Sequence, residues 1–413
     1  MADRTDRHHD LIVFGATSFV GEILTRHLVD RHGSTGPLRW AIAGRNPSKL
    51  AEVAERTSAA VDQIVVDAAS ADDMALLAAQ TRVVVSTVGP YATYGSELVA
   101  AAAAAGTDYC DLTGEPHWMR RMIDAHGSTA TESGARIVHA CGFDSIPSDL
   151  GVWFLQQAAI ERFGRPLHRI AMRVRSMKGG PSGGTLASMH NVMDELRSDP
   201  SLRKVLTNPY SLAPDGMRSG VRQPDVRVPA RDDLFDEWVA PFVMASVNTK
   251  VVHRTNALLD HVYGADFAYD EATLMGSGPA GALKAGGLTA GLGGFMAASA
   301  VRPVRDLLTG RVLPAPGEGP TPEEQLAGRF DIRFRGRTAE GQGLAARVTG
   351  DRDPGYGSTA KMLGEAALLL TEDERRGQGS GGFHTPANAF GDALIEALQE
   401  HAGLTFDIDP TFE

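Results

Sequence analysis

Cysteine and positive charge are both scarce in this sequence. Only two cysteines, Cys110 and Cys141, occur in 413 residues, a number that fits a reducing cytosol and excludes a multi-cysteine zinc site. Acidic residues outnumber basic ones by 51 to 40, which gives a formal net charge of −11. This balance argues against nucleic-acid binding, because neutralising phosphates requires a basic face. We therefore expect a cytoplasmic protein with no metal and no nucleic-acid partner.

Several catalytic motifs are also missing. The chain contains no Tyr-x-x-x-Lys pair, which short-chain reductases use for acid–base catalysis, and no His-Glu-x-x-His or Cys-x-x-Cys sequence. Metal-dependent hydrolysis therefore has no support. Residues 1–10 are polar and lack an apolar run, so we expect a disordered tail with His8 and His9 in solvent, and no signal peptide.

The sequence does contain a regular alternation of short apolar runs and helical patterns over residues 11–150. Such alternation predicts parallel strands joined by right-handed crossovers, and hence a Rossmann-type doubly wound α/β sheet. The chain is too long for one typical domain, and its pattern changes after residue 150. Candidate strands at 168–179, 329–338 and 343–353 predict a second, α+β domain with a mixed sheet.

This second domain is expected to span residues 151–353, with two unusual segments. Residues 199–235 are rich in Pro, Asp and Arg, which predicts an irregular excursion. Residues 276–301 are dense in glycine and alanine and carry one charge, Lys284. They predict a buried small-residue helix or a mobile loop, or else an element that contacts the inner face of the membrane. Their uncharged part is at the lower limit of length for a helix that crosses a membrane. Residues 354–413 predict helices that pack back on the first domain.

The first strand ends in a glycine turn typical of dinucleotide binding, "GATSFVG" at residues 15–21. Gly15 allows the tight turn and Gly21 a close helix–strand contact, so that backbone N–H groups reach a pyrophosphate. Ser18 stands near the position of a third glycine, where its hydroxyl either adds a phosphate contact or loosens the approach. The predicted cofactor residues here and after the fourth strand are Gly15, Ala16, Thr17, Ser18, Phe19, Val20, Gly21, Ser86, Thr87, Val88, Gly89 and Tyr91.

The end of the second strand favours NADPH over NADH. An NAD site normally carries an acidic residue there, whereas arginine accommodates a 2′-phosphate. This chain has Arg45, followed by Asn46 and, one turn later, Lys49. The planar guanidinium suits phosphate, although a merely solvated Arg45 is an alternative. Asp67, after the third strand, either contacts the adenine or caps a helix.

Five further motifs connect these features to a known family: "AGRNPSKL", "STVGPY", "DYCDLTGE", "CGFDSIPSDLG" and "GGPSGGTLAS". Together with "GATSFVG" they resemble the saccharopine dehydrogenase-like NADP-binding proteins, and among these the actinobacterial branch of trans-acting enoyl reductases. The resemblance covers nearly the whole chain. It implies a Rossmann domain, a second domain that completes the active site, NADP(H), and a role in lipid biosynthesis beside a polyketide synthase. Family members commonly have glycine where this chain has Ser18.

An enoyl thioester substrate sets specific chemical demands. Hydride is added to the β-carbon, and the developing enolate oxygen needs hydrogen-bond donors. Candidate substrate and oxyanion residues are Ser145, Ser182, Gly183, Gly184 and Thr185. A proton must then reach the α-carbon from a nearby acid or from water. The candidate acids are Tyr91, Lys178, His190 and Asp144. The alternatives are a turn and helix cap for Asp144 and Ser145, and packing between domains for Tyr91.

We therefore predict an NADPH-dependent oxidoreductase that reduces the C=C bond of an enoyl polyketide or fatty acyl thioester, free or carrier-bound. An amino-dicarboxylate substrate would need basic residues in the cleft, and the candidate cleft loops show no concentration of them. Saccharopine-type or other C=N or C=O reduction is therefore the alternative, ranked below reduction of an apolar substrate. A non-catalytic NADPH-binding module that docks on a synthase or membrane is a further alternative. A homo-oligomer is compatible with the sequence.

Overall fold

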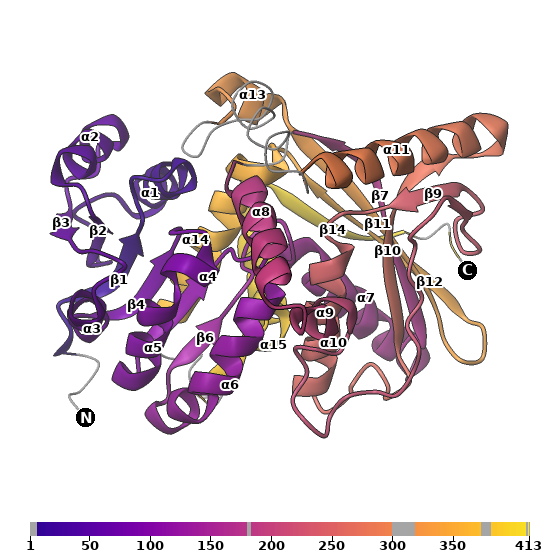
Figure 1. The fold of residues 1–413 in the computed structure, drawn as a ribbon, viewed down its shortest axis with the longest axis horizontal. Coiled ribbons are helices and arrows are strands. Elements are labelled where there is room, and N and C mark those ends of the chain that lie inside the picture. The colour runs from indigo at the N-terminus through magenta and orange to yellow at the C-terminus, as the bar shows by residue number, and fades with distance from the viewer. Residues whose placement is uncertain (1–5, 180–182, 300–318, 373–380, 410–411, 413) are drawn as a thin grey trace.

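The fold consists of two seven-stranded sheets, each with its own helices (Figure 1). The computed structural model describes residues 6–179, 183–299, 319–372, 381–409 and 412. The first sheet is wholly parallel and the second is mixed. The predicted α/β class with two kinds of sheet is therefore confirmed.

The first sheet has the order β3-β2-β1-β4-β5-β6-β13. This is the strand order of a Rossmann fold, in which the chain reverses direction next to β1 and leaves a ligand crevice there. The alternation expected over residues 11–150 is present as six strands, and a seventh comes from the C-terminal part of the chain. The strands are β1 (His9–Phe14), β2 (Trp40–Gly44), β3 (Asp62–Val65), β4 (Thr81–Ser86), β5 (Asp108–Asp111), β6 (Arg136–Val138) and β13 (Gly382–His384).

Helices cover both faces of this sheet because successive side chains of a strand point to opposite sides. In β1, Leu11 and Val13 join one hydrophobic cluster, whereas Ile12 and Phe14 join the other. The first face packs against α1 (Phe19–His32), α2 (Pro47–Thr57) and α14 (Thr359–Thr371). The second packs against α3 (Ala71–Ala79), α5 (Ser96–Ala105) and α6 (Pro116–Ser133), with the short α4 (Tyr91–Tyr94) ahead of α5.

The second sheet has the order β14-β12-β11-β7-β10-β9-β8, and β7 and β10 are its parallel pair. The three strands expected at 168–179, 329–338 and 343–353 correspond to β7, β11 and β12. The strands are β7 (Arg169–Lys178), β8 (Ala230–Arg231), β9 (Trp238–Pro241), β10 (Ala268–Gly276), β11 (Arg329–Arg337), β12 (Gly343–Gly350) and β14 (Leu404–Asp409).

The remaining helices lie around the second sheet and between the two sheets (Figure 1). They are α7 (Ile146–Phe163), α8 (Gly183–Ser198), α9 (Leu202–Thr207), α10 (Ala245–Leu258), α11 (Gly278–Ser299), α13 (Pro322–Ala327), α15 (Pro386–Phe390), α16 (Asp392–His401) and the π-helical turn η2 (Pro354–Ser358). The cluster that contains Leu11 continues through α7 to Met172 and Phe334 of the second sheet. One hydrophobic core therefore joins the two domains.

The N-terminal tail is shorter than expected. β1 already begins at His9, which is buried. Arg7 donates hydrogen bonds to the carbonyl oxygens of Thr81 and Ala105 at 2.6 and 2.5 Å. Residues 6–10 are thus held by the first domain, and only 1–5 of the expected tail lie outside the described residues.

The other expected boundaries also differ. The boundary at residue 150 falls inside α7, which packs on β11 and β12 of the second sheet. Residues 354–413 contain more than helices: besides α14, which packs on α1 and β4, they supply β13 to the first sheet and β14 to the second. The C-terminal part of the chain therefore fastens the two domains together.

The glycine- and alanine-rich segment forms α11, with residues 300 and 301 outside the described part of the chain. Its buried residues are Gly281, Ala285 and Ser299, whereas the side chain of Leu283 is 79% exposed. The expectation of a buried helix or a mobile loop is therefore wrong: the segment is a helix that packs on β9 and β10, and most of its described side chains are exposed or half-buried. Among the described residues, no helix is long and apolar enough to cross a membrane.

Candidate functional site

The glycine turn after β1 forms a cradle that side chains would fill. Gly15 has φ +92°, and a Cβ at this residue would lie 2.7 Å from Thr87 Oγ1. A Cβ at Gly21 would collide with the carbonyl oxygen of Gly15. Both glycines are therefore required, and they leave the first turn of α1 open for a pyrophosphate. The residues present fit a dinucleotide cofactor.

Ser18 is used by the turn itself. It is the N-cap of α1, where its Oγ accepts a hydrogen bond from Gly21 N at 2.9 Å. The same oxygen lies 2.9 Å from Thr87 Oγ1, and Thr87 Oγ1 donates to the carbonyl oxygen of Gly15 at 2.9 Å. The hydroxyl of Ser18 therefore occupies one N–H group that a phosphate would otherwise use.

Replacing Ser18 with glycine is expected to tighten binding of the dinucleotide cofactor roughly tenfold, because the N–H group of Gly21 becomes free for a charged oxygen. The helix loses little, since a serine-to-glycine change at an N-cap costs only a few tenths of a kcal/mol. Titration of the Ser18→Gly variant by protein fluorescence would measure the Kd. Weaker binding would instead mean that the hydroxyl itself contacts the phosphate.

The end of β2 presents unpaired positive charge beside this turn. A Cβ at Gly44 would lie 3.7 Å from the side chain of Thr17, so the next residue, Arg45, follows directly beside the cradle. Arg45 and Lys49 are both exposed, and within the described part of the chain the guanidinium of Arg45 has no acidic partner. It is available for an incoming anion.

Two neighbouring polar residues serve the protein's own turns. Asn46 caps α2 by accepting a hydrogen bond from Lys49 N at 3.1 Å. Asp67 Oδ1 accepts one from Ala69 N at 3.0 Å, within the turn before α3. The N-cap of α3 is Ser70, so Asp67 does not cap that helix. Their side chains are therefore less available to a cofactor than that of Arg45.

A cavity of about 520 Å³ begins at the N-terminus of α1 and extends between the two domains. The residues at its cofactor end include Ser18, Phe19, Val20, Thr87 and Gly89. Much of the wall is apolar, from α8, α11 and the segment before α10: Met189, Val192, Met193, Leu196, Met244 and Met296. Methionine adapts its shape easily to a flexible apolar ligand. This wall therefore suits a hydrocarbon chain.

Asp144 places a single acid in this cavity. Among the described residues that line the cavity, it is the only one with a carboxyl group, and none is Lys or Arg. Its Oδ2 lies 3.4 Å from the position of a Cβ on Gly114, and no hydrogen bond to another described residue is present. Burial raises the pKa of this carboxyl group to about 6. Asp144 is thus a protonatable group in an otherwise uncharged space.

The hydroxyl of Tyr91 is engaged elsewhere, although its ring lines the cavity. It donates a hydrogen bond to the carbonyl oxygen of Ser86 at 2.9 Å. Burial raises the pKa of Tyr91 well above its ordinary value. This geometry favours a structural role for Tyr91 over the transfer of a proton.

Three other expected residues do not belong to the described cavity wall. Lys178 is exposed at the end of β7, and His190 lies on α8 but is not among the residues that line the cavity. Ser145 is buried and donates to Asn248 Oδ1 at 3.1 Å. For these three, the catalytic or substrate role expected from their position in the sequence is not supported.

The expected oxyanion segment is only partly described. Gly184 lines the cavity, but Gly183 N donates to the hydroxyl oxygen of Tyr356 at 2.8 Å and is therefore occupied. Ser182 and the side chain of Thr185 lie outside the described residues. Tyr356 itself lines the cavity and packs edge-on against Phe19 at 4.8 Å. It was not anticipated, because it is far from the cofactor turn in sequence.

Glu115 is a further residue to which the sequence analysis assigned no role. Its buried carboxylate accepts hydrogen bonds from Tyr91 N and Ala92 N, both at 2.9 Å, and from Ser188 Oγ at 2.7 Å. Ser188 belongs to α8 and lines the cavity. Glu115 thereby connects the loop at the cofactor end with the helix that forms the apolar wall. Its position between β5 and α6, at the edge of the sheet where ligands bind, was the available signal.

Replacing Ser188 with alanine is expected to raise the KM of the substrate that occupies this cavity roughly fivefold, the equivalent of one hydrogen bond of about 1 kcal/mol. The Kd of the dinucleotide cofactor should change less than twofold, because Glu115 keeps its bonds to the Tyr91 loop. Steady-state kinetics would measure this split. The matched control is Ser246→Ala, a lining serine whose Oγ donates within its own segment, to the Val243 carbonyl oxygen at 3.4 Å. Equal effects of the two variants would contradict the role of the Glu115 contact.

The curated relatives of this chain share one description. No family model matches the chain. It is 42% identical over 409 residues to a candidate trans-acting enoyl reductase of Mycobacterium tuberculosis, covering 95% of this chain and 96% of the relative. It is 38% identical over 406 residues to a trans-acting enoyl reductase of Mycobacterium bovis, with the same coverage.

The fold has a solved counterpart as well. A saccharopine dehydrogenase from Saccharomyces cerevisiae superposes with a TM-score of 0.53 at 12% sequence identity, covering 97% of this chain and all of that one. At this identity the likeness concerns the fold alone. It agrees with the Rossmann sheet and the mixed second sheet described above.

Proposed function

This chain belongs to the family of trans-acting enoyl reductases, and we propose that it reduces the C=C bond of an enoyl thioester with NADPH as the hydride donor. It is an oxidoreductase with a nicotinamide cofactor. The choice of NADPH, the substrate and the site residues are parts of the proposal.

The observation that supports the proposal most strongly is the composition of the cavity. It begins at the cofactor turn, holds one carboxyl group and no Lys or Arg among its described lining residues, and is otherwise largely apolar. An amino-dicarboxylate such as saccharopine would leave its charges unpaired there, at a large desolvation cost. An acyl chain would bury methylene groups, each worth about 0.8 kcal/mol. The lining thus favours the enoyl substrate over the saccharopine alternative.

Different residues of the site bind the cofactor, donate the proton and exclude water. The turn at Gly15 and the N-terminus of α1 would hold the pyrophosphate, and Arg45 would bind the 2′-phosphate. The nicotinamide, when bound, would supply the hydride that the β-carbon of the substrate accepts. Asp144 donates its proton to the α-carbon, so that one hydride and one proton together saturate the double bond. The apolar wall excludes water from the reacting carbons.

The substrate is expected to arrive as a long acyl chain on a carrier. The four methionines in the wall adapt to chains of different shape, and Met296 of α11 places the exposed, apolar face of that helix at the cavity. A polyketide synthase that presents its acyl chain in trans fits this arrangement.

Steady-state oxidation of NADPH against enoyl thioesters of increasing chain length tests this function. The value of kcat/KM should rise roughly fourfold per added methylene until the cavity is filled. Ketoacyl thioesters and saccharopine serve as comparison substrates and should be turned over poorly. A flat chain-length profile, or faster turnover of saccharopine, would contradict the proposal.

A further inference from the structure

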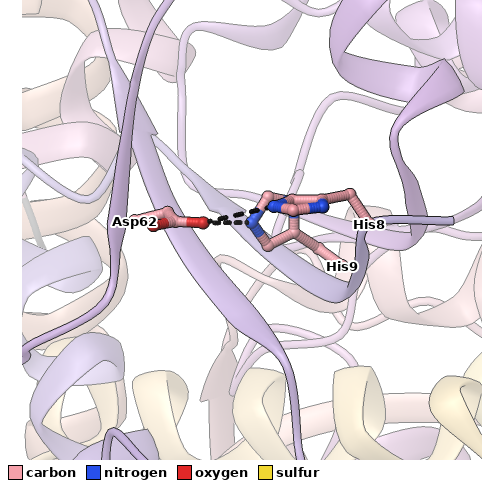
Figure 2. A group of neighbouring side chains, drawn as sticks. All are labelled: His8, His9 and Asp62. Atoms are coloured by element: carbon pink, nitrogen blue, oxygen red, sulfur yellow. Dashed lines mark hydrogen bonds and ion pairs between the residues drawn. The ribbon is translucent and has the colours of Figure 1, made fainter.

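Two imidazoles and a carboxylate converge at the end of the first sheet that lies opposite the cofactor turn. His8 and His9 stand at the start of β1, and Asp62 stands at the start of β3. The Nε2 atoms of His8 and His9 lie 3.6 and 3.0 Å from Asp62 Oδ2. Figure 2 shows both rings directed at this carboxylate, and the ring planes are 86° apart. The tail expected from the sequence thus contributes to a defined cluster.

The spacing of these donor atoms fits a small transition-metal ion. All three lie within 4.8 Å of one another. In a tetrahedral zinc site with bonds of about 2.0–2.1 Å, neighbouring ligand atoms are roughly 3.3 Å apart, and the two observed distances lie on either side of this value. Among the residues that the structure describes, no other three His, Cys, Asp or Glu side chains are grouped in this way.

The surroundings give the cluster one fixed ligand and an open side. His9 is buried, with 4% of its surface exposed. The side chains of His8 and Asp62 are 74% and 66% exposed. An ion can therefore reach the cluster directly from solvent, and its fourth position would be taken by water, an arrangement that zinc accepts.

We propose that His8, His9 and Asp62 form a Zn²⁺ site. The ion would join the strand that leads into the cofactor turn to β3 at the edge of the same sheet. It would act as a structural link at a distance from the reacting carbons, and the proposal is independent of the enoyl reductase function.

The test uses the full chain without a histidine tag, stripped with a chelator and titrated with Zn²⁺ in competition with a metal indicator. We expect saturable binding of one ion per chain and a rise in Tm, because an ion that binds only the folded state stabilises it. His8→Ala and Asp62→Asn should each weaken binding at least roughly tenfold, since even outer-shell partners contribute 10- to 100-fold. Both residues are exposed, so these variants are expected to fold.

The control is a second histidine–aspartate pair that lacks a third donor. His168 Nδ1 lies 3.3 Å from Asp266 Oδ2, and both side chains are exposed. His168→Ala should leave the stoichiometry and affinity unchanged. The visible absorption of Co²⁺, used as a spectroscopic probe, should appear with the native chain and disappear with His8→Ala. Absence of one-to-one binding, or binding that survives both His8→Ala and Asp62→Asn, would overturn the proposal.

Discussion

Replacing Asp144 with asparagine is expected to lower kcat for an enoyl thioester by about 10²- to 10⁴-fold, the usual contribution of a positioned acid. Asparagine has nearly the same size and cannot supply the proton. The Kd of NADPH should be unchanged, because Asp144 lies beyond the glycine turn, in the loop after β6. Single-turnover kinetics together with a binding titration would separate the two quantities.

The pH dependence of the native enzyme should carry the same signature. Burial raises the pKa of Asp144 to about 6, and only the protonated form donates. The value of kcat/KM should therefore be level below pH 6 and fall as the pH rises above it, with a slope that approaches tenfold per pH unit. In Asp144→Asn this decline should disappear. Asp67→Asn, which removes a carboxyl group outside the cavity, is the control and should keep the native profile.

Replacing Arg45 with alanine is expected to reduce the preference for NADPH over NADH by roughly 10- to 100-fold. A charge-assisted contact with the 2′-phosphate contributes about 1.5–3 kcal/mol, and NADH lacks this 2′-phosphate. The ratio of kcat/KM for the two cofactors is the quantity to measure.

The variant Arg26→Ala provides a matched control for Arg45. Arg26 lies on α1 and pairs with Glu22 of the same helix at 3.6 Å, so its loss removes a surface charge without touching the end of β2. It should leave the cofactor preference unchanged. An Arg45→Ala enzyme that keeps the native preference would show that Arg45 is merely solvated.

The first domain could be predicted from the sequence because its signals are local. Each of β1 to β6 is a short apolar run followed by a helical pattern, and Gly15 and Gly21 mark the turn that the strand order then places at the crevice. The strand β13 has three residues and pairs with β6 across more than 240 positions of sequence. β14 likewise pairs with a distant strand, β12. Nothing in their own residues indicates these partners.

The site was predictable to a smaller extent for the same reason. Asp144 could be found because it follows a strand, at the edge where ligands bind. Ser145, one residue later, donates its hydroxyl hydrogen bond to Asn248 instead. In a loop, the order of residues in the sequence does not reveal which of two neighbouring side chains enters a cavity. Tyr356, Ser188 and Met296 reach the cavity from segments that tertiary packing brings together, and Glu115 is defined by three partners rather than by a motif.

The most direct test of the central claim is the transfer of deuterium from NADPH labelled at C4 of the nicotinamide to a long-chain enoyl thioester, followed by mass spectrometry and NMR of the product. The predicted result is one deuterium at the β-carbon and one solvent proton at the α-carbon of a saturated thioester, with one NADPH oxidised per product. Transfer of the label to a carbonyl or imine carbon while the C=C bond stays intact, or no transfer to any acyl thioester, would contradict the assignment of enoyl reduction to this cavity.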